Sequence, residues 1–348
     1  MSKNENRVLF VGDSRKMKGG VSSVMKNISQ SDLWTEWNCY WLENQINSGL
    51  LLKIVYFFRG LIYGLFIIPR YSIIHFQTAP GRSLIVNMPL MVYANLWKRK
   101  IITQLHVGNQ IKDHLDDASL KFWVTHSDLV LLLGKQWRDI MYAKFPIKGR
   151  FEYVYNPVEI RERQLAPQKY FLYAAYFNIN KGASILLNAF REVVKEFPDW
   201  KLVMCGSGND EKVCNLLKQC DFAQSIILPG WVSGKQKEEY FRNAYAYCMT
   251  SYKEGLPMSV LEAMSYGVPV ITTPVGCLPE ILTDEQSCLF FQFGNAEQLA
   301  LQMKRLILDQ ELRQNLSIQS YNIAAAEFSI SAIARRLHSF YMKLIHTL

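Results

Sequence analysis

Short apolar runs alternate along the chain with longer segments in which apolar residues recur at helical spacing. Near-continuous apolar runs are typical of strands that are buried on both faces of a parallel sheet. The alternation therefore predicts an α/β protein with doubly wound sheets. In the first half it predicts strands at 8–12, 71–76, 100–106 and 128–134, and helices near 21–30, 50–68, 83–98 and 135–145.

The same alternation is repeated after a polar segment, 155–170, that contains two prolines. This segment predicts a boundary between two Rossmann-like domains, 1–160 and 161–348. Ligands of doubly wound sheets bind at the carboxyl ends of the strands, so two such sheets facing each other would leave a cleft there. The second half predicts strands at 170–175, 201–206, 225–230, 246–250, 269–273 and 288–291, and helices near 181–197, 209–221, 235–244, 257–267, 295–309, 311–326 and 330–345.

The most informative segment is 251–280, SYKEGLPMSVLEAMSYGVPVITTPVGCLPE. Gly255, Leu256 and Pro257 form a turn, and a proline is well suited to the first position of the helix that follows. The free N–H groups at a helix start favour phosphate. Glu254 and Glu262 stand on either side of this start, about 12 Å or less apart at the helical rise. They are therefore able to contact opposite ends of an anion such as a nucleotide diphosphate sugar.

This segment resembles the signature of the retaining GT-B glycosyltransferases of family 4, the glycosyl transferases group 1. The match includes the Glu-x7-Glu spacing, EGLPMSVLE, and the continuation EAMSYGVPVITTPVGCLPEIL. The resemblance implies a GT-B fold, with 1–160 on the acceptor side and 161–348 binding the nucleotide sugar. It also implies that the last helix crosses back to the first domain, that Glu254 binds hydroxyls of the transferred sugar, and that Glu262 binds the ribose.

The family usually carries an arginine and a lysine that clamp the pyrophosphate, in the pattern G-R-x4-K-G. Here Lys181 and Gly182 match the end of this pattern, whereas Tyr176 stands where the arginine is expected. A bidentate arginine–phosphate contact is among the stronger charge-assisted bonds, so its loss puts donor type or activity in doubt. Arg161 and Arg163 are candidates to replace it, although nothing in the sequence places them.

Three further loops follow predicted strands and resemble loops of the family. Gly206 and Gly208 follow one strand and Trp231 follows the next, and the resemblance implies that they hold the nucleobase. Trp231 is equally suited to stacking on the base and to packing the domain. Gly276 and Glu280 match the family turn after the GVPV strand, where structural roles are favoured.

In the first half, Gly19 and Gly20 follow the first strand and precede a helix. Paired glycines let backbone N–H groups approach a phosphate closely, but an ordinary tight turn explains them equally well. Lys16 and Lys18 favour the phosphate interpretation. His106 ends a strand, and the resemblance implies a position near the transferred sugar; a core histidine is the alternative, and His75 is a second candidate.

The chain contains no D-x-D motif, which other glycosyltransferases use to hold a metal. We therefore expect metal-independent catalysis and no cofactor, with Lys181 and the helix start meeting the phosphate charge. The seven cysteines are scattered and form no C-x-x-C, so neither a zinc site nor a disulfide framework is indicated. A reduced, cytoplasmic setting fits, and the N-terminal residues lack a secretory apolar region.

Charge is concentrated in the first half. Residues 1–160 hold 20 Lys+Arg and 12 Asp+Glu, a net of +8 out of the +9 of the whole chain, and 51–100 holds seven basic residues and no acid. This asymmetry indicates an anionic partner, of which an anionic membrane surface and a phosphorylated substrate remain, because no nucleic-acid-binding motif is present. The apolar segment 51–71 is interrupted by Lys53 and Arg59, which argues against a spanning helix. It is either a core helix, which we favour slightly, or a helix lying on a membrane surface with Lys53, Arg59 and Arg70 at the head groups.

These observations predict a retaining, metal-independent glycosyltransferase. It would move a hexose from a nucleotide diphosphate sugar to a hydroxyl of a glycan acceptor, carried on a lipid as a polysaccharide precursor, at the cytoplasmic face of the membrane. The alternative is a catalytically weak or inactive GT-B protein that binds a sugar nucleotide, which Tyr176 favours. A sugar-nucleotide epimerase fits the EGLPMSVLEAM pattern less well.

Overall fold

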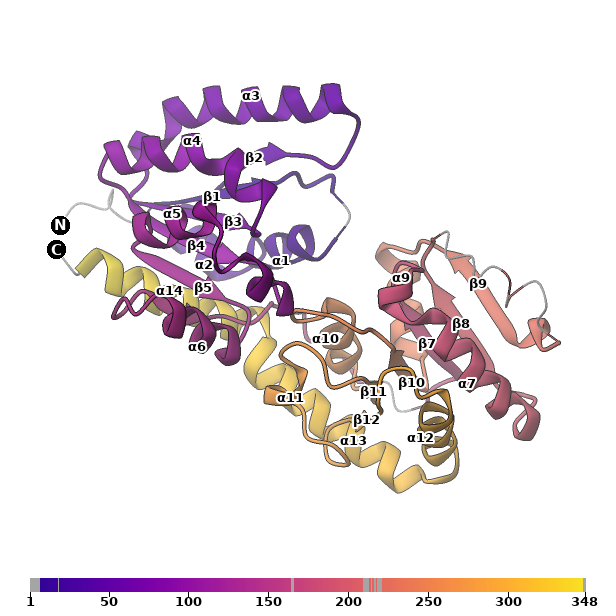
Figure 1. Cartoon of the computed structure of the whole chain (residues 1–348). Helices are drawn as coiled ribbons and strands as arrows, with labels where there is room; N and C mark the ends of the chain where they lie inside the picture. Colours follow the sequence, from indigo (N-terminus) through magenta and orange to yellow (C-terminus); the bar gives the residue numbers. More distant parts are fainter. Residues whose placement is uncertain are drawn as a thin grey trace. The chain divides into compact units, whose positions relative to one another are not determined.

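The computed structural model describes residues 7–17, 19–163, 166–208, 213, 215, 217 and 221–346. The chain forms two compact units (Figure 1). The first comprises the chain up to Pro157 together with Phe328–Leu348, and the second comprises Val158–Glu327. The division therefore lies three residues before the predicted boundary at 160/161, and the last helix groups with the first unit.

The first unit is built on a six-stranded parallel sheet of order β2-β1-β3-β4-β5-β6. Four strands lie where apolar runs predict them, and two were not predicted: β2, in which three polar residues end a short apolar run, and β6, which is only three residues long. The strands are β1 (Val8–Asp13), β2 (Tyr40–Gln45), β3 (Ile73–Thr78), β4 (Lys100–Leu105), β5 (Leu129–Leu132) and β6 (Phe151–Tyr153).

Helices cover both faces of this sheet. α3 and α4 lie side by side on one face, and α14 lies on the other face beside α1 and α2 (Figure 1). Parallel strands are joined by right-handed crossovers. The connection from β1 to β2 moves one way across the sheet and the connection from β2 to β3 moves the other way, so the helices of the two connections lie on opposite faces. The helices are α1 (Gly20–Ile28), α2 (Asp32–Glu36), α3 (Leu50–Ile67), α4 (Arg82–Leu96), α5 (Ala118–His126), α6 (Lys135–Lys144) and α14 (Ile330–His346), with 3-10 turns η1 (Ile68–Arg70) and η2 (Asn109–His114).

α14 completes the core of the first unit. Its apolar face, which includes Leu337 and Tyr341, is fully buried. The Trp37 indole N–H donates to His338 Nδ1 at 3.2 Å, and the Tyr341 hydroxyl bonds His75 Nδ1 at 2.8 Å. The first sheet therefore depends on residues from the far end of the chain.

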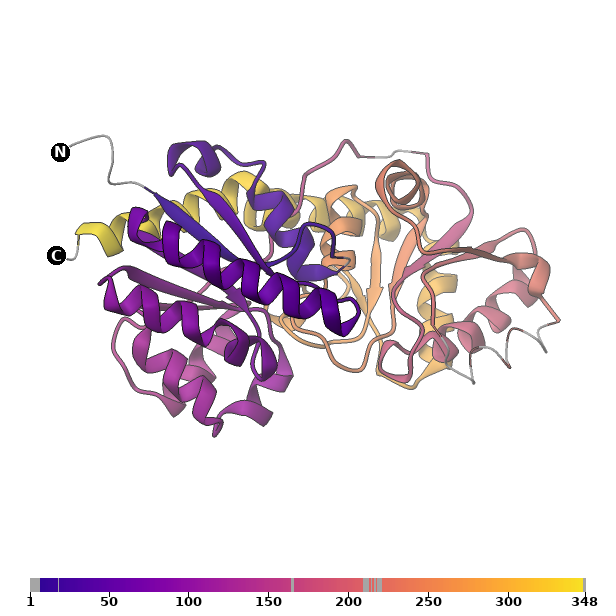
Figure 2. The same cartoon turned by 90° about the horizontal axis from the view of Figure 1, so that it is seen from above.

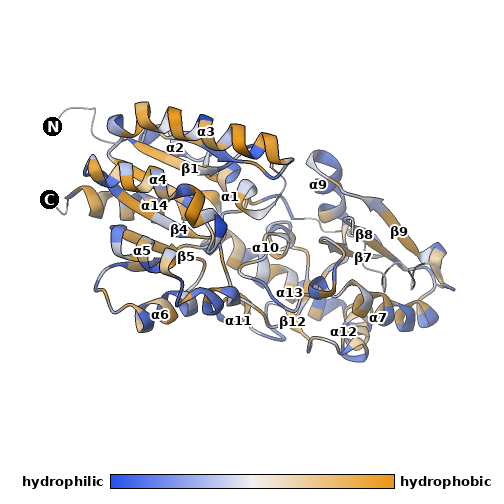
Figure 3. Ribbon diagram, turned by 45° about the horizontal axis from the view of Figure 1, so that its top comes forward, coloured by the Kyte–Doolittle hydropathy of each residue, from blue (hydrophilic) through white to orange (hydrophobic). Residues whose placement is uncertain are grey.

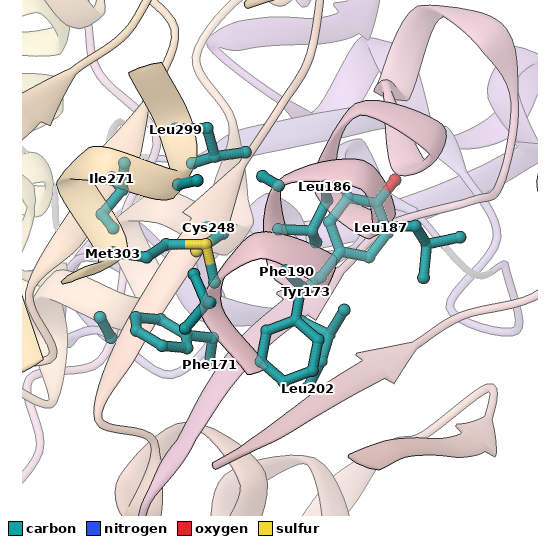
Figure 4. Close-up of a cluster of buried hydrophobic side chains, with 14 of the residues drawn as sticks. Phe171, Tyr173, Leu186, Leu187, Phe190, Leu202, Cys248, Ile271, Leu299 and Met303 are labelled. Carbon is teal, nitrogen blue, oxygen red and sulfur yellow. The ribbon is translucent and has the colours of Figure 1, made fainter. Parts of the chain in front are cut away.

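The second unit repeats the architecture, with a parallel sheet of order β12-β11-β10-β7-β8-β9. Side chains of β7, β8 and β10 pack against α7 and α12 to form its apolar core (Figure 4). The strands are β7 (Tyr170–Ala174), β8 (Lys201–Cys205), β9 (Ile226–Gly230), β10 (Ala246–Met249), β11 (Val270–Thr272) and β12 (Leu289–Phe290). The helices are α7 (Ala183–Glu196), α9 (Gly234–Asn243), α10 (Met258–Ser265), α11 (Leu278–Ile281), α12 (Ala296–Leu308) and α13 (Gln310–Ile323), with turns η3 (Ile179–Lys181) and η4 (Ala223–Ser225) and the π-helical segment η5 (Ala324–Phe328). The helix predicted at 209–221 lies mostly outside the described residues.

α3 departs from expectation. Its predicted span is correct, but it lies on the outside of the first unit (Figure 2) and only Tyr56, Gly60 and Gly64 are buried. The favoured interpretation of 51–71 as a core helix is therefore wrong. The reason is that two glycines and a single bulky residue, Tyr56, form its buried face, so most of the bulky apolar side chains remain exposed.

Candidate functional site

In the second unit, loops at the carboxyl ends of neighbouring strands are packed together through glycines. A Cβ on Gly206 would lie 1.9 Å from the Ala175 carbonyl oxygen, and one on Gly208 would lie 2.2 Å from the Phe177 carbonyl oxygen. The Phe177 N–H donates to the Ser207 carbonyl at 2.9 Å. Gly206 and Gly208 are thus required for the β7 and β8 loops to lie against each other, and any nucleobase-binding role remains a prediction.

The loop after β7 places Lys181 beside the loop after β10. The Asn178 side chain accepts from the Lys181 N–H at 3.0 Å, and the Thr250 hydroxyl donates to the Lys181 carbonyl at 2.7 Å. Gly182 has φ +61°, and a Cβ there would lie 2.1 Å from the Thr250 carbonyl oxygen. The backbone on both sides of the Lys181 side chain is therefore fixed.

Lys181 and Glu254 are brought together. Lys181 Nζ lies 2.5 Å from Glu254 Oε1, with 14% of the carboxylate side chain exposed. Tyr176 is 47% exposed at the position of the expected arginine. Arg161 pairs with Glu159 and Glu238, and the Arg163 side chain packs against Gly267, so neither is positioned to replace the arginine within the second unit.

Glu262 forms a second ion pair, with Lys237 of α9, whose Nζ lies 2.6 Å from Glu262 Oε1. Sequence reasoning missed Lys237. The available signal was its place in the first turn of a helix that follows the β9 loop, in the sequence GKQKEEY. Lys237 is thus a second positively charged side chain in this unit. It lies on α9, whereas the arginine is expected in the loop after β7.

The turn before α10 is held by the loop after β11. The Cys277 N–H donates to the Gly255 carbonyl at 2.9 Å, and a Cβ on Gly276 would lie 2.2 Å from that carbonyl oxygen. Leu256 and Pro257 are buried. Pro257 is the residue before α10, so the helix begins one residue later than predicted.

Trp231 follows β9 and is 48% exposed. About half of the side chain is therefore accessible to solvent. Stacking on a nucleobase remains a prediction.

In the first unit, Gly19 immediately precedes α1 with φ +148°, a conformation that strongly favours glycine, and a Cβ there would meet nothing within 4 Å. Gly20 is the first residue of α1, and both glycines are exposed. The helix start therefore presents open backbone next to Lys16. Lys18 lies outside the described residues.

His106 lies at the end of β4 in a hydrogen-bonded chain of side chains. Its Nε2–H donates to Gln77 Oε1 at 2.5 Å, and Gln77 Nε2 lies 2.9 Å from Gln104 Oε1 and 3.1 Å from His75 Nε2. Burial lowers the pKa of His106 to about 4 and that of His75 to about 3. His106 is therefore neutral near pH 7, with Nδ1 left as a hydrogen-bond acceptor.

His75, the second candidate, is fully buried between Gln77 and Tyr341 and is a core residue. Asp13, which sequence reasoning missed, ends β1, which is separated from β4 by β3 alone in the sheet. Burial raises the pKa of the Asp13 carboxyl to about 6. A titratable carboxyl and a neutral imidazole thus occupy the same edge of the first sheet.

Among the residues that the structure describes, no group of three or more His, Cys, Asp and Glu side chains is arranged to hold a metal ion. Metal independence and the lack of a cofactor remain predictions.

Comparison with known proteins identifies the domain that carries the two ion pairs. The model of the family "Glycosyl transferases group 1" matches residues 158–323. These residues are a group 1 glycosyltransferase domain. The glycosyltransferase domain thus contains Lys181, Lys237, Glu254 and Glu262, and the predicted resemblance to the glycosyl transferases group 1 is confirmed.

Curated relatives extend the similarity to the first unit. The chain is 23% identical over 287 residues to the lipopolysaccharide 1,6-galactosyltransferase of Salmonella typhimurium, covering 77% of this chain and 80% of the relative. It is 21% identical to the Escherichia coli enzyme of the same name, covering 97% and 99%. The glycosyltransferase is thus similar, over most or nearly all of its length, to relatives that are named as galactosyltransferases.

Solved structures confirm the GT-B fold. Anabaena HepE in complex with UDP superposes with a TM-score of 0.77 at 15% identity, covering 97% of this chain and 100% of HepE. The lipopolysaccharide outer core galactosyltransferase WaaB superposes with a TM-score of 0.70 at 17% identity, covering 97% and 99%. At these identities the likeness establishes the fold of the glycosyltransferase.

Proposed function

We propose that this glycosyltransferase is a retaining, metal-independent hexosyltransferase. It takes a hexose from a nucleoside diphosphate sugar and transfers it to a hydroxyl of a glycan acceptor, as part of a lipid-linked polysaccharide precursor. The observation that carries the proposal is the pairing of Lys181 with Glu254 on glycine-packed loops at the carboxyl ends of β7 and β10. Relatives named as lipopolysaccharide galactosyltransferases support the hexose and the acceptor class.

In the donor complex, Lys181 would exchange part of its contact with Glu254 for the pyrophosphate. Glu254 would then accept hydrogen bonds from hexose hydroxyls. Glu262 would bind ribose hydroxyls, and Lys237, released from Glu262, would supply the second positive charge that Tyr176 does not. Gly19 and Gly20 would offer backbone N–H groups to phosphate, and structures of HepE with UDP and with UDP-glucose support this donor class.

In the transfer step the bond between the anomeric carbon and the phosphate oxygen breaks, and the acceptor oxygen bonds the same face of that carbon. The acceptor proton passes to the departing phosphate oxygen. Positive charge from Lys181 and the start of α10 would offset the charge that develops on the leaving diphosphate. Neutral His106 would accept a hydrogen bond from a hexose hydroxyl at Nδ1.

Donor binding tests the proposal. Titration of purified protein with UDP-sugars and GDP-sugars, followed by thermal shift and calorimetry, should show binding of one donor. Lys181→Ala, Glu262→Ala and Lys237→Ala should each weaken it about tenfold or more, because each removes a charge-assisted contact. Lys235→Ala and Glu239→Ala are matched controls, since both residues are exposed on α9. Unchanged donor affinity in all three test variants would refute the pocket.

A second candidate, a GT-B protein that binds a sugar nucleotide without transfer, is favoured by the exposed Tyr176. The two functions differ in product. Sustained release of nucleoside diphosphate from a bound donor, by hydrolysis or transfer, supports the enzyme, whereas tight binding without release supports the binding protein. Analysis of the anomeric configuration of the product tests retention, and activity in EDTA tests metal independence.

We also propose that the reaction takes place in the cytoplasm. The five cysteines of the described chain that are assigned as free thiols support this setting, because disulfides persist in oxidising compartments. Fractionation of cells that express the protein, with a periplasmic marker as control, tests it.

A further inference from the structure

α3 packs closely on the first unit through two glycines, and Tyr56 is the other residue that it buries there. A Cβ on Gly60 would lie 2.3 Å from Asn44 Cβ, and one on Gly64 would lie 2.4 Å from Leu90 Cδ2. The helix backbone therefore rests directly on β2 and α4. In an ordinary amphipathic helix the large apolar residues face the core, so α3 has the opposite arrangement.

The bulky apolar residues of α3 point away from the unit. The segment Leu50–Arg70 is strongly apolar, yet only 22% of its 18-residue apolar stretch is buried inside the protein. Leu51 is 75% exposed and Phe66 is 69% exposed. The ribbon of α3 is coloured as hydrophobic along most of its length (Figure 3). Contiguous apolar surfaces of this kind mark sites of protein or membrane contact. The other exposed apolar residues of α3 are Leu50, Leu52, Ile54, Val55, Phe58, Ile62, Tyr63 and Leu65.

α4 continues the apolar surface. An open groove of about 630 Å³ runs between α3 and α4, and its lining includes Leu61, Ile85, Val92 and Leu96. The Tyr93 hydroxyl, the only side-chain polar group in the lining apart from thioether sulfur, already donates to the Leu65 carbonyl at 3.0 Å. The groove therefore offers no unsatisfied side-chain hydrogen-bonding group and suits hydrocarbon.

Positive charge surrounds this surface. Arg70 and Lys98 follow the ends of α3 and α4, and Arg82 begins α4. None of the three, nor Lys53 or Arg59, forms an ion pair with a described residue. Residues 51–100 contain no acid that would repel an anionic partner.

Trp97, 47% exposed, lies next to Lys98. Tryptophan beside lysine is typical of the boundary between hydrocarbon and head groups.

We propose that the surface formed by α3 and α4 docks the protein onto a bilayer containing anionic phospholipid. α3 lies in the plane of the interface, with its outer side chains in the acyl region and the basic residues at the lipid phosphates. α3 does not span, because it connects β2 to β3 of one sheet and its glycine face is packed on that sheet's domain. Charge complementarity distinguishes this occupant from a second copy of the chain, whose own surface here would be equally basic.

Vesicle sedimentation tests the proposal. The full chain is mixed with phosphatidylcholine vesicles with or without 30% phosphatidylglycerol, at low and high salt. Binding should require the anionic lipid and should weaken as salt screens the head groups. Equal binding to both vesicle types, or to neither, would overturn the proposal.

Two matched pairs of double variants separate the contribution of the apolar side chains to vesicle binding from that of the basic side chains. Leu51→Gln/Phe66→Gln should lower the partition coefficient tenfold or more, whereas Leu301→Gln/Leu308→Gln, on the exposed face of α12, should leave it unchanged. Arg70→Gln/Lys98→Gln should lower it about fivefold for each charge, and Lys148→Gln/Lys195→Gln serves as the control of equal charge.

Light scattering tests whether the surface instead binds a second copy of the chain. All of the test residues are exposed, so thermal melts should show that the variants fold. A concentration-dependent dimer that Leu51→Gln/Phe66→Gln abolishes, without vesicle binding by the original protein, would assign the surface to a second copy and overturn the proposal.

Discussion

His75 makes the first unit sensitive to acid. The side chain is fully buried, and burial, followed by the neighbouring His106, lowers its pKa from 6.5 to about 3. In the unfolded chain this imidazole takes up a proton as the pH falls below 6.5, whereas in the folded chain it stays neutral down to about pH 3. The stability that the neutral, buried imidazole contributes to the folded state is therefore fully present above pH 6.5, and it is lost progressively as the pH falls from 6.5 toward 3.

The size of the effect follows from proton linkage. At pH 5 the unfolded state binds almost one more proton at this site, so the free energy of unfolding falls by roughly 1.3 kcal/mol per pH unit because of His75 alone. Between pH 6 and pH 4 this amounts to about 2.5 kcal/mol. His75→Gln removes the titrating group and retains a polar side chain. Between pH 6 and pH 4 the free energy of unfolding of this variant should therefore fall by about 2.5 kcal/mol less than that of the original protein.

Urea denaturation at pH 6, 5 and 4 measures the difference. Tryptophan fluorescence is a suitable signal, because six of the eight tryptophans belong to the first unit. His126→Gln, which removes an exposed imidazole, is the control. If His75→Gln loses stability with acid as steeply as the original protein, His75 is not held neutral by the fold.

Three further predictions concern single residues. Asp13→Asn should stabilise the protein at pH 8 by up to about 3 kcal/mol and have little effect near pH 4, measured by urea denaturation, because burial raises the pKa of this carboxyl to about 6 and so penalises its charged form. Gly182→Ala should lower the melting temperature well below that of Gly234→Ala, since both have φ near +60° but only a Cβ on Gly182 meets a carbonyl, that of Thr250; equal losses would contradict this. Tyr341→Phe should cost about 1–3 kcal/mol in the same denaturation assay, because His75 Nδ1 loses its partner.

Much of the architecture follows from local pattern. Buried parallel strands and their helices are encoded by continuous apolar runs and 3.6-residue spacing, which the sequence displays directly. β2 was missed because Glu43, Asn44 and Gln45 interrupt its apolar run, and this edge strand gains its place by pairing with β1. The local signal is therefore weakest where tertiary pairing selects the strand.

The contacts that functional residues make are harder to predict from the sequence. α3 is apolar on all sides, so its pattern does not show which face packs, and the spacing of Gly60 and Gly64 was the only indication. The pairing of Glu262 with Lys237 and the contact of His75 with Tyr341 depend on how distant segments meet, which no local rule specifies. The motif EGLPMSVLE, by contrast, identified the domain because its residues are contiguous.

The order in which the chain is synthesised bears on α14. His75 and Tyr341 are separated by 266 positions, so a helix that covers the first sheet leaves the ribosome only after the whole of the second unit. The second unit, Val158–Glu327, is by then entirely translated and free to fold as a unit. The earliest-made strands therefore finish folding after the later ones, and a premature stop codon that removes α14 would expose apolar surface in the part of the protein that was made first.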